Sequence, residues 1–296
     1  MTSEWSPSRL GNLSGKRIIV TGATNGVGLA TARALARAGA HVILAVRNLE
    51  LGAQRAAEMG GDTEIVKLDL ADQTSVRAFP GLFDGDVDIL INNAGLVAQN
   101  RSDTVDGFEI TMGTNFLGPF ALTNLLFDRV RSQIINVGSD AHKRATLAFD
   151  DPHLRSLKWS SFPAYARSKL AVMLWGLELD RRLRAAGSPV IAQLTHPGWV
   201  ASNLTNVSDT RLMSAVHTAA QQFANRIGND IDAGAAPTLY CITEPIPPGS
   251  YVGIDGRFGF KGGPTLSGRT PNACDYDAAR RLWEFAEKET GTTLPV

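Results

Sequence analysis

The sequence has little of what marks several large protein classes. Only two cysteines occur among its 296 residues, and Cys241 and Cys274 stand apart without a CxxC spacing, which suits a reducing compartment better than a disulfide framework. Its 29 basic residues balance 29 acidic ones, so the formal net charge is zero. A chain without a basic block lacks the charge that attracts nucleic acid or an anionic membrane. The composition therefore argues against nucleic acid as a partner.

Long apolar runs and close metal-ligand spacings are missing as well. No stretch approaches the roughly 18 apolar residues that cross a bilayer. The first 15 residues contain no apolar signal-peptide core, because Glu4 and Pro7 interrupt them. The five histidines show no HExxH or similar spacing, so no metal site is predicted. We expect a cytoplasmic protein without an integral membrane segment.

What the sequence does contain is an alternation of short β-branched runs with longer helical stretches. Between residues 17 and 198 this alternation is typical of βαβ units in a parallel sheet that is buried on both faces. We expect an α/β fold in a single domain, residues 1–296: a Rossmann-type, doubly wound parallel sheet of about seven strands with helices on both faces. The expected strands are 17–20, 41–46, 63–68, 87–93, 132–138, 189–195 and 251–254, and the best-marked helices are 27–38, which Gly39 ends, 106–128, 164–186 and 275–290.

A glycine-rich segment, TGATNGVG at 21–28, joins the first expected strand to the first helix. Gly22, Gly26 and Gly28 would let a dinucleotide pyrophosphate approach the helix N-terminus, whose free N–H groups stabilise negative charge. Any tight strand-to-helix turn could use such a triplet, and Thr21 and Asn25 could hydrogen-bond in the turn under either interpretation. The strand before it and the helix after it favour dinucleotide binding.

The end of the second strand separates the two nicotinamide cofactors. Val46 stands where an acidic residue would bind the ribose hydroxyls of NAD, and Arg47 offers a guanidinium that suits a 2′-phosphate. NADP is therefore favoured over NAD, the alternative being that Arg47 is a solvated charge at the strand end. Asp69 ends the third strand at the same rim. It could accept a hydrogen bond from the adenine amine or cap the helix that starts near Asp72.

Candidate catalytic residues follow the next two strands and lie on one helix. Asn93–Gly95 close the fourth strand beside the expected cleft, and Ser139 closes the fifth. Tyr165 and Lys169 are four residues apart on a predicted helix, so they share one face. A cation nearby would lower the tyrosine pKa and make the phenol a general acid or base for a carbonyl/alcohol pair. Alone, a tyrosine and a lysine at this spacing are usually solvent-exposed helix residues without a function. Together with Ser139 and the glycine turn, they are interpreted as catalytic.

These motifs, taken in order along the chain, resemble the short-chain dehydrogenase/reductase family in its common YxxxK form. The likeness is carried by TGATNGVG, NNAG, Asn115, Ser139, YARSK at 165–169 and HPG at 196–198. Between Ser139 and Tyr165 stand 25 residues, a longer gap than is usual in the family. That gap, with AVRN after the second strand, is similar to the retinol dehydrogenase-like and protochlorophyllide reductase-like branch, which mostly uses NADP.

The resemblance implies a role for each catalytic residue. Tyr165 would exchange a proton with the substrate oxygen, and Lys169 would lower its pKa and bind the nicotinamide ribose. Ser139 would hold the carbonyl oxygen. The Asn115 main chain would hold a water that links the lysine to solvent, although a polar break in a buried helix is the alternative interpretation of Asn115.

The resemblance also implies a set of cofactor contacts, with one departure from the family pattern. Asn25 stands where many NADP-using members have a basic residue, so Arg47 alone is expected to recognise the phosphate. The expected cofactor-binding residues are Gly22, Thr24, Asn25, Gly26, Val27, Gly28, Arg47, Asn48, Asp69, Leu70, Asn93, Ala94, Gly95, Tyr165, Lys169, Pro197, Gly198, Val200 and Ser202.

By the same resemblance, residues 15–198 form the dinucleotide-binding and catalytic core, 199–250 a substrate-binding flap, and 251–296 a C-terminal strand and helix. The flap and the tract 140–163 would set specificity. Apolar flap residues favour a lipophilic aldehyde, ketone or alcohol of retinoid, steroid or long-chain type; they are Leu204, Leu212, Met213, Val216 and Phe223.

Two further expectations concern partners and an alternative function. Many relatives pair through the helices that contain Asn115 and Tyr165, which implies a homodimer or homotetramer. The alternative to an enzyme is a sensor or scaffold that binds NADP(H) without turnover. Such members typically lose the tyrosine or the lysine, and this chain keeps both.

Overall fold

The computed structural model describes residues 5–198, 230–256 and 262–296. They form one eight-stranded sheet in the order β3-β2-β1-β4-β5-β6-β7-β8, in which all neighbours are parallel except β7 and β8. Its strand order reverses at β1, the pattern of a doubly wound sheet. The strands are β1 (Arg17–Thr21), β2 (His41–Val46), β3 (Thr63–Lys67), β4 (Val87–Asn92), β5 (Val130–Val137), β6 (Ile191–Thr195), β7 (Tyr251–Ile254) and β8 (Pro264–Leu266).

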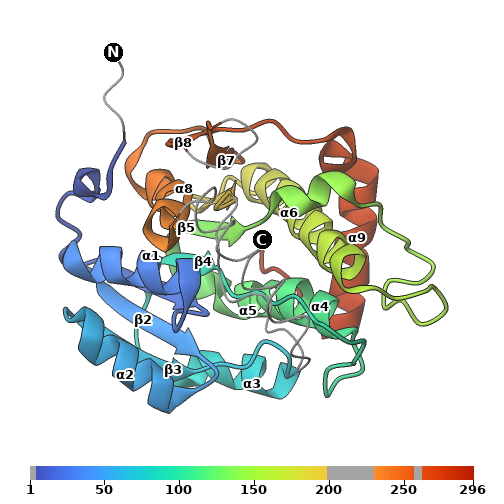
Figure 1. The fold of residues 1–296 in the computed structure, drawn as a ribbon, viewed down its shortest axis with the longest axis horizontal. Helices are drawn as coiled ribbons and strands as arrows, with labels where there is room; N and C mark the ends of the chain where they lie inside the picture. Colours follow the sequence, from blue (N-terminus) through green and yellow to red (C-terminus); the bar gives the residue numbers. More distant parts are fainter. Residues whose placement is uncertain (1–4, 199–229, 257–261) are drawn as a thin grey trace, which may run out of the picture.

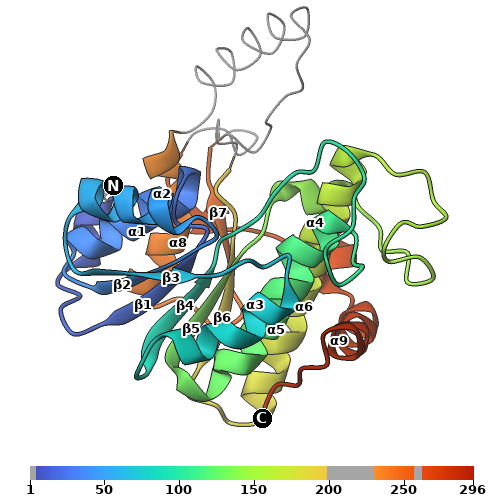
Figure 2. The same cartoon turned by 90° about the horizontal axis from the view of Figure 1, so that it is seen from below.

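Helices cover both faces of this sheet, which confirms the predicted Rossmann-type fold. Figure 2 shows α1, α2 and α8 on one side of the strands and α3 to α6 on the other, with α9 outside α6 (Figures 1 and 2). Each side has its own apolar core, which explains why the strands are continuous apolar runs. The helices are α1 (Gly26–Arg37), α2 (Leu49–Met59), α3 (Gln73–Ala78), α4 (Ile110–Met112), α5 (Gly118–Leu126), α6 (Ser161–Ala185), α8 (Ile231–Thr243) and α9 (Tyr276–Thr290).

The structure differs from the predicted elements in two places. β8 lies in a Gly/Pro-rich segment for which the sequence predicts no strand. It has three residues and begins with Pro264, which an edge strand tolerates because its outer side needs no ladder partner. The helix predicted over 106–128 begins only at Ile110 and is interrupted by a π-helical turn, Gly113–Leu117, between α4 and α5.

The C-terminal helix is packed firmly onto α5 and α6. Trp283 of α9 is buried, and its ring lies edge-on to Phe120 of α5 with 5.0 Å between centroids. The Arg182 guanidinium of α6 stacks over the same indole at 4.4 Å. α9 therefore covers part of the outer surface of α5 and α6.

No helix in the described ranges combines the length and the apolar character that a membrane span requires.

Candidate active site

The glycine loop is packed tightly against the end of β4. Thr21 Oγ1 accepts hydrogen bonds from the backbone N–H groups of Asn93 and Ala94, both at 3.0 Å, and Asn93 Nδ2 donates to the Thr21 carbonyl at 2.9 Å. A Cβ on Gly22, whose φ is +68°, would stand 2.9 Å from the Ala94 Cα. A Cβ on Gly28 would collide with the Asn93 amide. Only glycine fits at these two positions. The contacts of Thr21 Oγ1 confirm that Thr21 hydrogen-bonds in this turn.

The first turn of α1 opens onto this loop. Asn25 is the N-cap residue of α1, but its side chain forms no capping hydrogen bond with the first turn of this helix. Its Nδ2 lies 3.4 Å from Thr24 Oγ1 instead. The N–H groups that begin the helix therefore remain available to an anion, and the positive end of the helix dipole points the same way. The glycine loop and the open helix end fit a dinucleotide pyrophosphate.

The ends of β2 and β3 form the rim beside the loop. Arg47 is exposed, and its carbonyl accepts a hydrogen bond from Lys67 Nζ at 2.6 Å. Asn48 caps α2 by accepting from the Leu51 N–H at 3.0 Å. Asp72, not Asp69, caps α3, so the capping alternative for Asp69 is wrong.

The structure brings Ser139, Tyr165 and Lys169 together at the carboxyl end of β5. Ser139 is the N-cap of a 3₁₀ turn, Asp140–Arg144, where its Oγ accepts from the Ala141 N–H at 3.2 Å, and its side chain offsets part of the rise in pKa that burial causes at the Tyr165 phenol. Tyr165 and Lys169 share one face of α6, with Lys169 Nζ 5.8 Å from the tyrosine ring centroid. Lys169 Nζ also donates to the Val137 carbonyl at 2.8 Å.

The charges at this site differ from the sequence-based expectation. Burial raises the pKa of Tyr165, and the hydrogen bond from Ser139 offsets this only in part. Burial also lowers the pKa of Lys169 to about 8. The expected lowering of the tyrosine pKa by the lysine is therefore not seen, because desolvation of the buried phenol is the largest influence on it.

Asn115 lies in the π-helical turn, next to the lysine. Its side chain is fully used: Oδ1 accepts from the Leu96 N–H at 2.8 Å, and Nδ2 donates to the Leu96 carbonyl at 3.0 Å and to Ser168 Oγ at 2.9 Å. Four residues later stands Pro119, which has no N–H to give to the Asn115 carbonyl as an α-helix would require. The Asn115 carbonyl therefore lacks the i+4 donor that a regular α-helix would give it.

Comparison with known proteins agrees with this geometry. A sequence profile of the short-chain dehydrogenases matches residues 16–212. The chain belongs to the short-chain dehydrogenase/reductase family. Retinol dehydrogenase 13 of Homo sapiens is 35% identical over 96% of this chain and 87% of its own length, and polyprenol dehydrogenase of Mus musculus is 34% identical over 98% and 88%. A crystal structure of an uncharacterized protein from Mycobacterium paratuberculosis is 40% identical, with a TM-score of 0.86 over 99% of this chain and all of that one.

Family membership and these relatives place the chain in the retinol dehydrogenase-like branch, as predicted. It is an oxidoreductase that acts on CH–OH groups, in a family that binds NAD(P).

A polar cluster that no sequence motif signals lies behind Ser139. The Asp140 carboxylate accepts from the Tyr251 hydroxyl of β7 at 3.3 Å and lies 3.6 Å from His196 Nε2. His196 Nδ1 accepts from the Gly198 N–H at 3.2 Å, so its proton is on Nε2, facing Asp140. Burial lowers the His196 pKa to about 4 and keeps the ring neutral. The cluster ties the HPG turn to the turn that follows Ser139.

Of the expected contacts near that turn, Pro197 and Gly198 lie beside the cluster, whereas Val200 and Ser202 lie outside the described residues. No spacing signalled the cluster, because Asp140 and Tyr251 are 111 residues apart.

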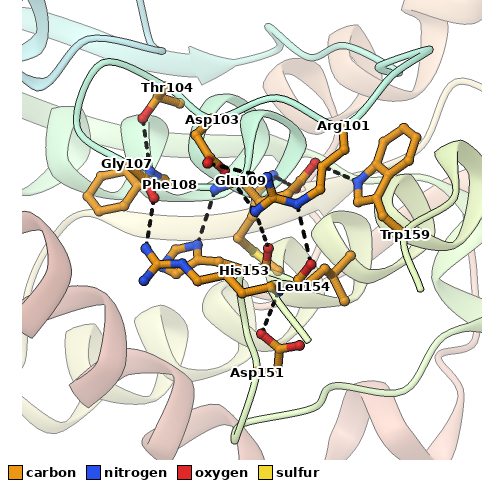
Figure 3. Close-up of polar contacts among 12 residues, drawn as sticks. Arg101, Asp103, Thr104, Gly107, Phe108, Glu109, Asp151, His153, Leu154 and Trp159 are labelled. Carbon is orange, nitrogen blue, oxygen red and sulfur yellow. Dashed lines mark hydrogen bonds and ion pairs between the residues drawn. The ribbon is translucent and has the colours of Figure 1, made fainter. Parts of the chain in front are cut away.

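The long tract between Ser139 and Tyr165 is anchored to the segment 101–109 (Figure 3) and to α9. Glu109 is buried, and its carboxylate accepts from Trp159 Nε1 at 3.1 Å. The Glu109 N–H donates to His153 Nδ1 at 3.2 Å, and His153 Nε2 lies 3.2 Å from the Glu289 carboxylate of α9. Arg101 donates to the His153 and Leu154 carbonyls. The tract is thus fixed to the segment 101–109 and to α9.

Replacing His153 with alanine should loosen the attachment of this tract. The change leaves the buried Glu109 N–H without its acceptor, so we expect the free energy of unfolding to fall by about 2 kcal/mol. Urea denaturation measures this, and limited proteolysis should cut the tract at 145–160 faster. Lys158→Ala, an exposed change in the same tract, is the control. An His153→Ala protein as stable and as protease-resistant as the control would show that His153 does not anchor the tract.

Proposed function

We propose that this chain transfers hydride between NADP(H) and a lipophilic carbonyl or alcohol, with Tyr165 as the general acid/base. The observation that carries the proposal is the meeting of Ser139, Tyr165 and Lys169 at the end of β5, beside a glycine loop that fits a dinucleotide. A retained serine, tyrosine and lysine favour catalysis over the alternative of a non-catalytic NADP(H)-binding sensor or scaffold.

Each residue of the site then has a defined task. When bound, the nicotinamide supplies or accepts the hydride. In the direction of reduction, the Ser139 hydroxyl donates a hydrogen bond to the substrate oxygen, and the Tyr165 phenol donates the proton that this oxygen needs. Lys169 stabilises the phenolate that remains. Water held at the Asn115 carbonyl passes a proton from solvent to Lys169, which restores the phenol.

The preference for NADP rests on Arg47 and on the apolar Val46 in place of an acid. We expect Arg47→Ala to weaken NADPH binding about 10- to 100-fold, the value of a charge-assisted hydrogen bond, and to leave NADH binding unchanged. Quenching of tryptophan fluorescence, checked by calorimetry, gives both dissociation constants. Equal or tighter binding of NADH by the wild type would contradict the NADP preference, and binding of neither would contradict the proposed function.

The substrate class is supported by the relatives. Two of them are named for lipophilic alcohols, retinol and polyprenol. The apolar flap residues 204–223 lie outside the described residues. A retinoid-, steroid- or long-chain-aldehyde-like substrate remains our proposal.

The oligomeric state and the cytoplasmic location also remain predictions. Pairing through α5 and α6, as expected from the family, would have to accommodate α9, which already covers part of that surface through Trp283. A homodimer or homotetramer would therefore include α9 in its interface.

A further inference from the structure

An arginine that no sequence motif singled out reaches the glycine loop from the neighbouring helix. Arg55 lies in the middle of α2, and its Nε donates to the Thr24 carbonyl at 3.2 Å. Its side chain is 26% exposed, so the guanidinium lies at the solvent edge of the loop. The next residue of the loop, Asn25, is the position that lacks the basic side chain seen in many NADP-using relatives. Arg55 thus brings a positive charge to a loop that has none of its own.

Arg55 contacts the glycine loop and Arg47 follows the second strand, so the two arginines come from opposite sides of the expected position of the adenosine ribose. In a doubly wound sheet, the adenosine ribose of a dinucleotide lies between the glycine loop and the end of the second strand. Arg47 follows β2 directly, and α2 begins two residues later, after the Asn48 cap. Lys67 Nζ, bonded to the Arg47 carbonyl, adds a third cation at the strand ends. A phosphate on the ribose 2′-oxygen would therefore enter a basic rim.

Arg55 has hydrogen-bonding capacity left for such a phosphate. Its Nε is bonded to the loop, and its Nη1 pairs with Glu58 at 2.6 Å, one turn along α2. Nη2 has no hydrogen-bond partner in the described ranges, and a guanidinium offers five N–H donors in a rigid fork. The pairing also means that Glu58 opposes an incoming phosphate, because its carboxylate partly neutralises the cation and repels the anion.

We infer that Arg55 is a second phosphate-binding residue: it binds the 2′-phosphate of NADP(H) from the loop side while Arg47 binds it from the strand side, and Glu58 weakens this binding. The inference rests on the proposed NADP preference. It replaces the expectation that Arg47 alone recognises the phosphate.

The first test compares Arg55→Met with Arg55→Lys in the full-length protein. Dissociation constants are measured for NADPH and NADH by fluorescence, and for adenosine 2′,5′-bisphosphate and 5′-AMP by calorimetry. Arg55→Met should weaken the two 2′-phosphorylated ligands about tenfold, the low end for a hydrogen bond between charged groups, and the other two less than twofold. Arg55→Lys should lose less, because it keeps the charge. Arg280→Met, which breaks a similar i,i+3 pair with Asp277 on α9, is the control.

The second test uses the opposite change in the same ion pair. Glu58→Gln removes the opposing carboxylate and should tighten NADPH binding two- to threefold without affecting NADH. A pair that merely stabilised α2 and the loop would give the same direction of effect in Arg55→Met and Glu58→Gln. Opposite directions are therefore specific to a role in binding phosphate.

The outcomes also separate this inference from the proposed function. If the wild type prefers NADPH and Arg55→Met keeps the full preference, or weakens NADH equally, Arg55 is only a loop support and the inference is wrong. If the wild type prefers NADH, the proposed NADP preference is wrong and the inference falls with it. The thermal melting temperature of each variant shows whether it is folded.

Discussion

Tyr165→Phe should lower turnover by about 10²- to 10⁴-fold, the usual contribution of a positioned general acid or base. The change removes only the phenolic oxygen, so the ring should keep its place on α6 and its packing. Ser139 would still reach the substrate oxygen, but no group at that position could deliver the proton. Binding of NADPH should change less than twofold, because the tyrosine oxygen is not part of the phosphate-binding loop.

Single-turnover oxidation of NADPH with a panel of lipophilic aldehydes and ketones measures the effect on chemistry. Tyr240→Phe is a matched control, since this partly exposed tyrosine of α8 packs on Trp5, away from the catalytic residues. Turnover that survives in Tyr165→Phe would show that another group is the acid. A wild type that binds NADPH tightly and turns over no carbonyl would favour the sensor or scaffold alternative.

Lys169→Met should abolish most activity and at the same time stabilise the protein. The lysine is 4% exposed, and its pKa of about 8 lies well below the usual 10.5. The difference in pKa corresponds to about 3 kcal/mol by which the buried ammonium destabilises the folded state at pH 7. Methionine fills a similar volume without charge. Loss of the lysine should lower turnover at least 100-fold, because the Tyr165 phenolate loses its nearest cation.

The lowered pKa of Lys169 also determines how the stability of the wild type changes with pH. Between pH 8 and 10.5 the unfolded chain holds the lysine proton and the folded chain does not, so wild-type stability should rise with pH through this window. The stabilising effect of Lys169→Met should therefore be largest at or below pH 7 and shrink toward pH 10.5. Urea denaturation of both proteins at pH 7 and pH 10 measures it, with Lys158→Met as an exposed control. Equal stability of both proteins at pH 7 would show that the ammonium is not buried.

Much of the candidate site can be predicted from the sequence, because its residues follow short, local patterns. The glycine loop is contiguous, and the four-residue spacing of Tyr165 and Lys169 places them on one face of any α-helix. Ser139 was found because it ends a recognisable strand. The pKa of Tyr165 was not predictable, since burial of the phenol depends on the elements that pack around it.

Other contacts could not be predicted from the sequence, because they join single residues that are far apart in the chain. The Asp140, His196 and Tyr251 cluster joins three elements, and the contact of Arg55 with Thr24 joins a helix to a loop 31 residues away. None of these residues repeats with a period that a sequence pattern could reveal.

The sequence by itself determined the sheet, the order of its parallel strands along the chain and the glycine-rich turn after the first strand. Strands buried on both faces must be β-branched apolar runs, and a phosphate-binding turn must be glycine-rich. Only the tertiary structure decided where the edge strand β8 pairs, where a π-helical turn interrupts the helix at Asn115, and that Arg55 contacts the glycine loop. These depend on contacts between distant segments, which form only once the sheet and its two helical layers are assembled.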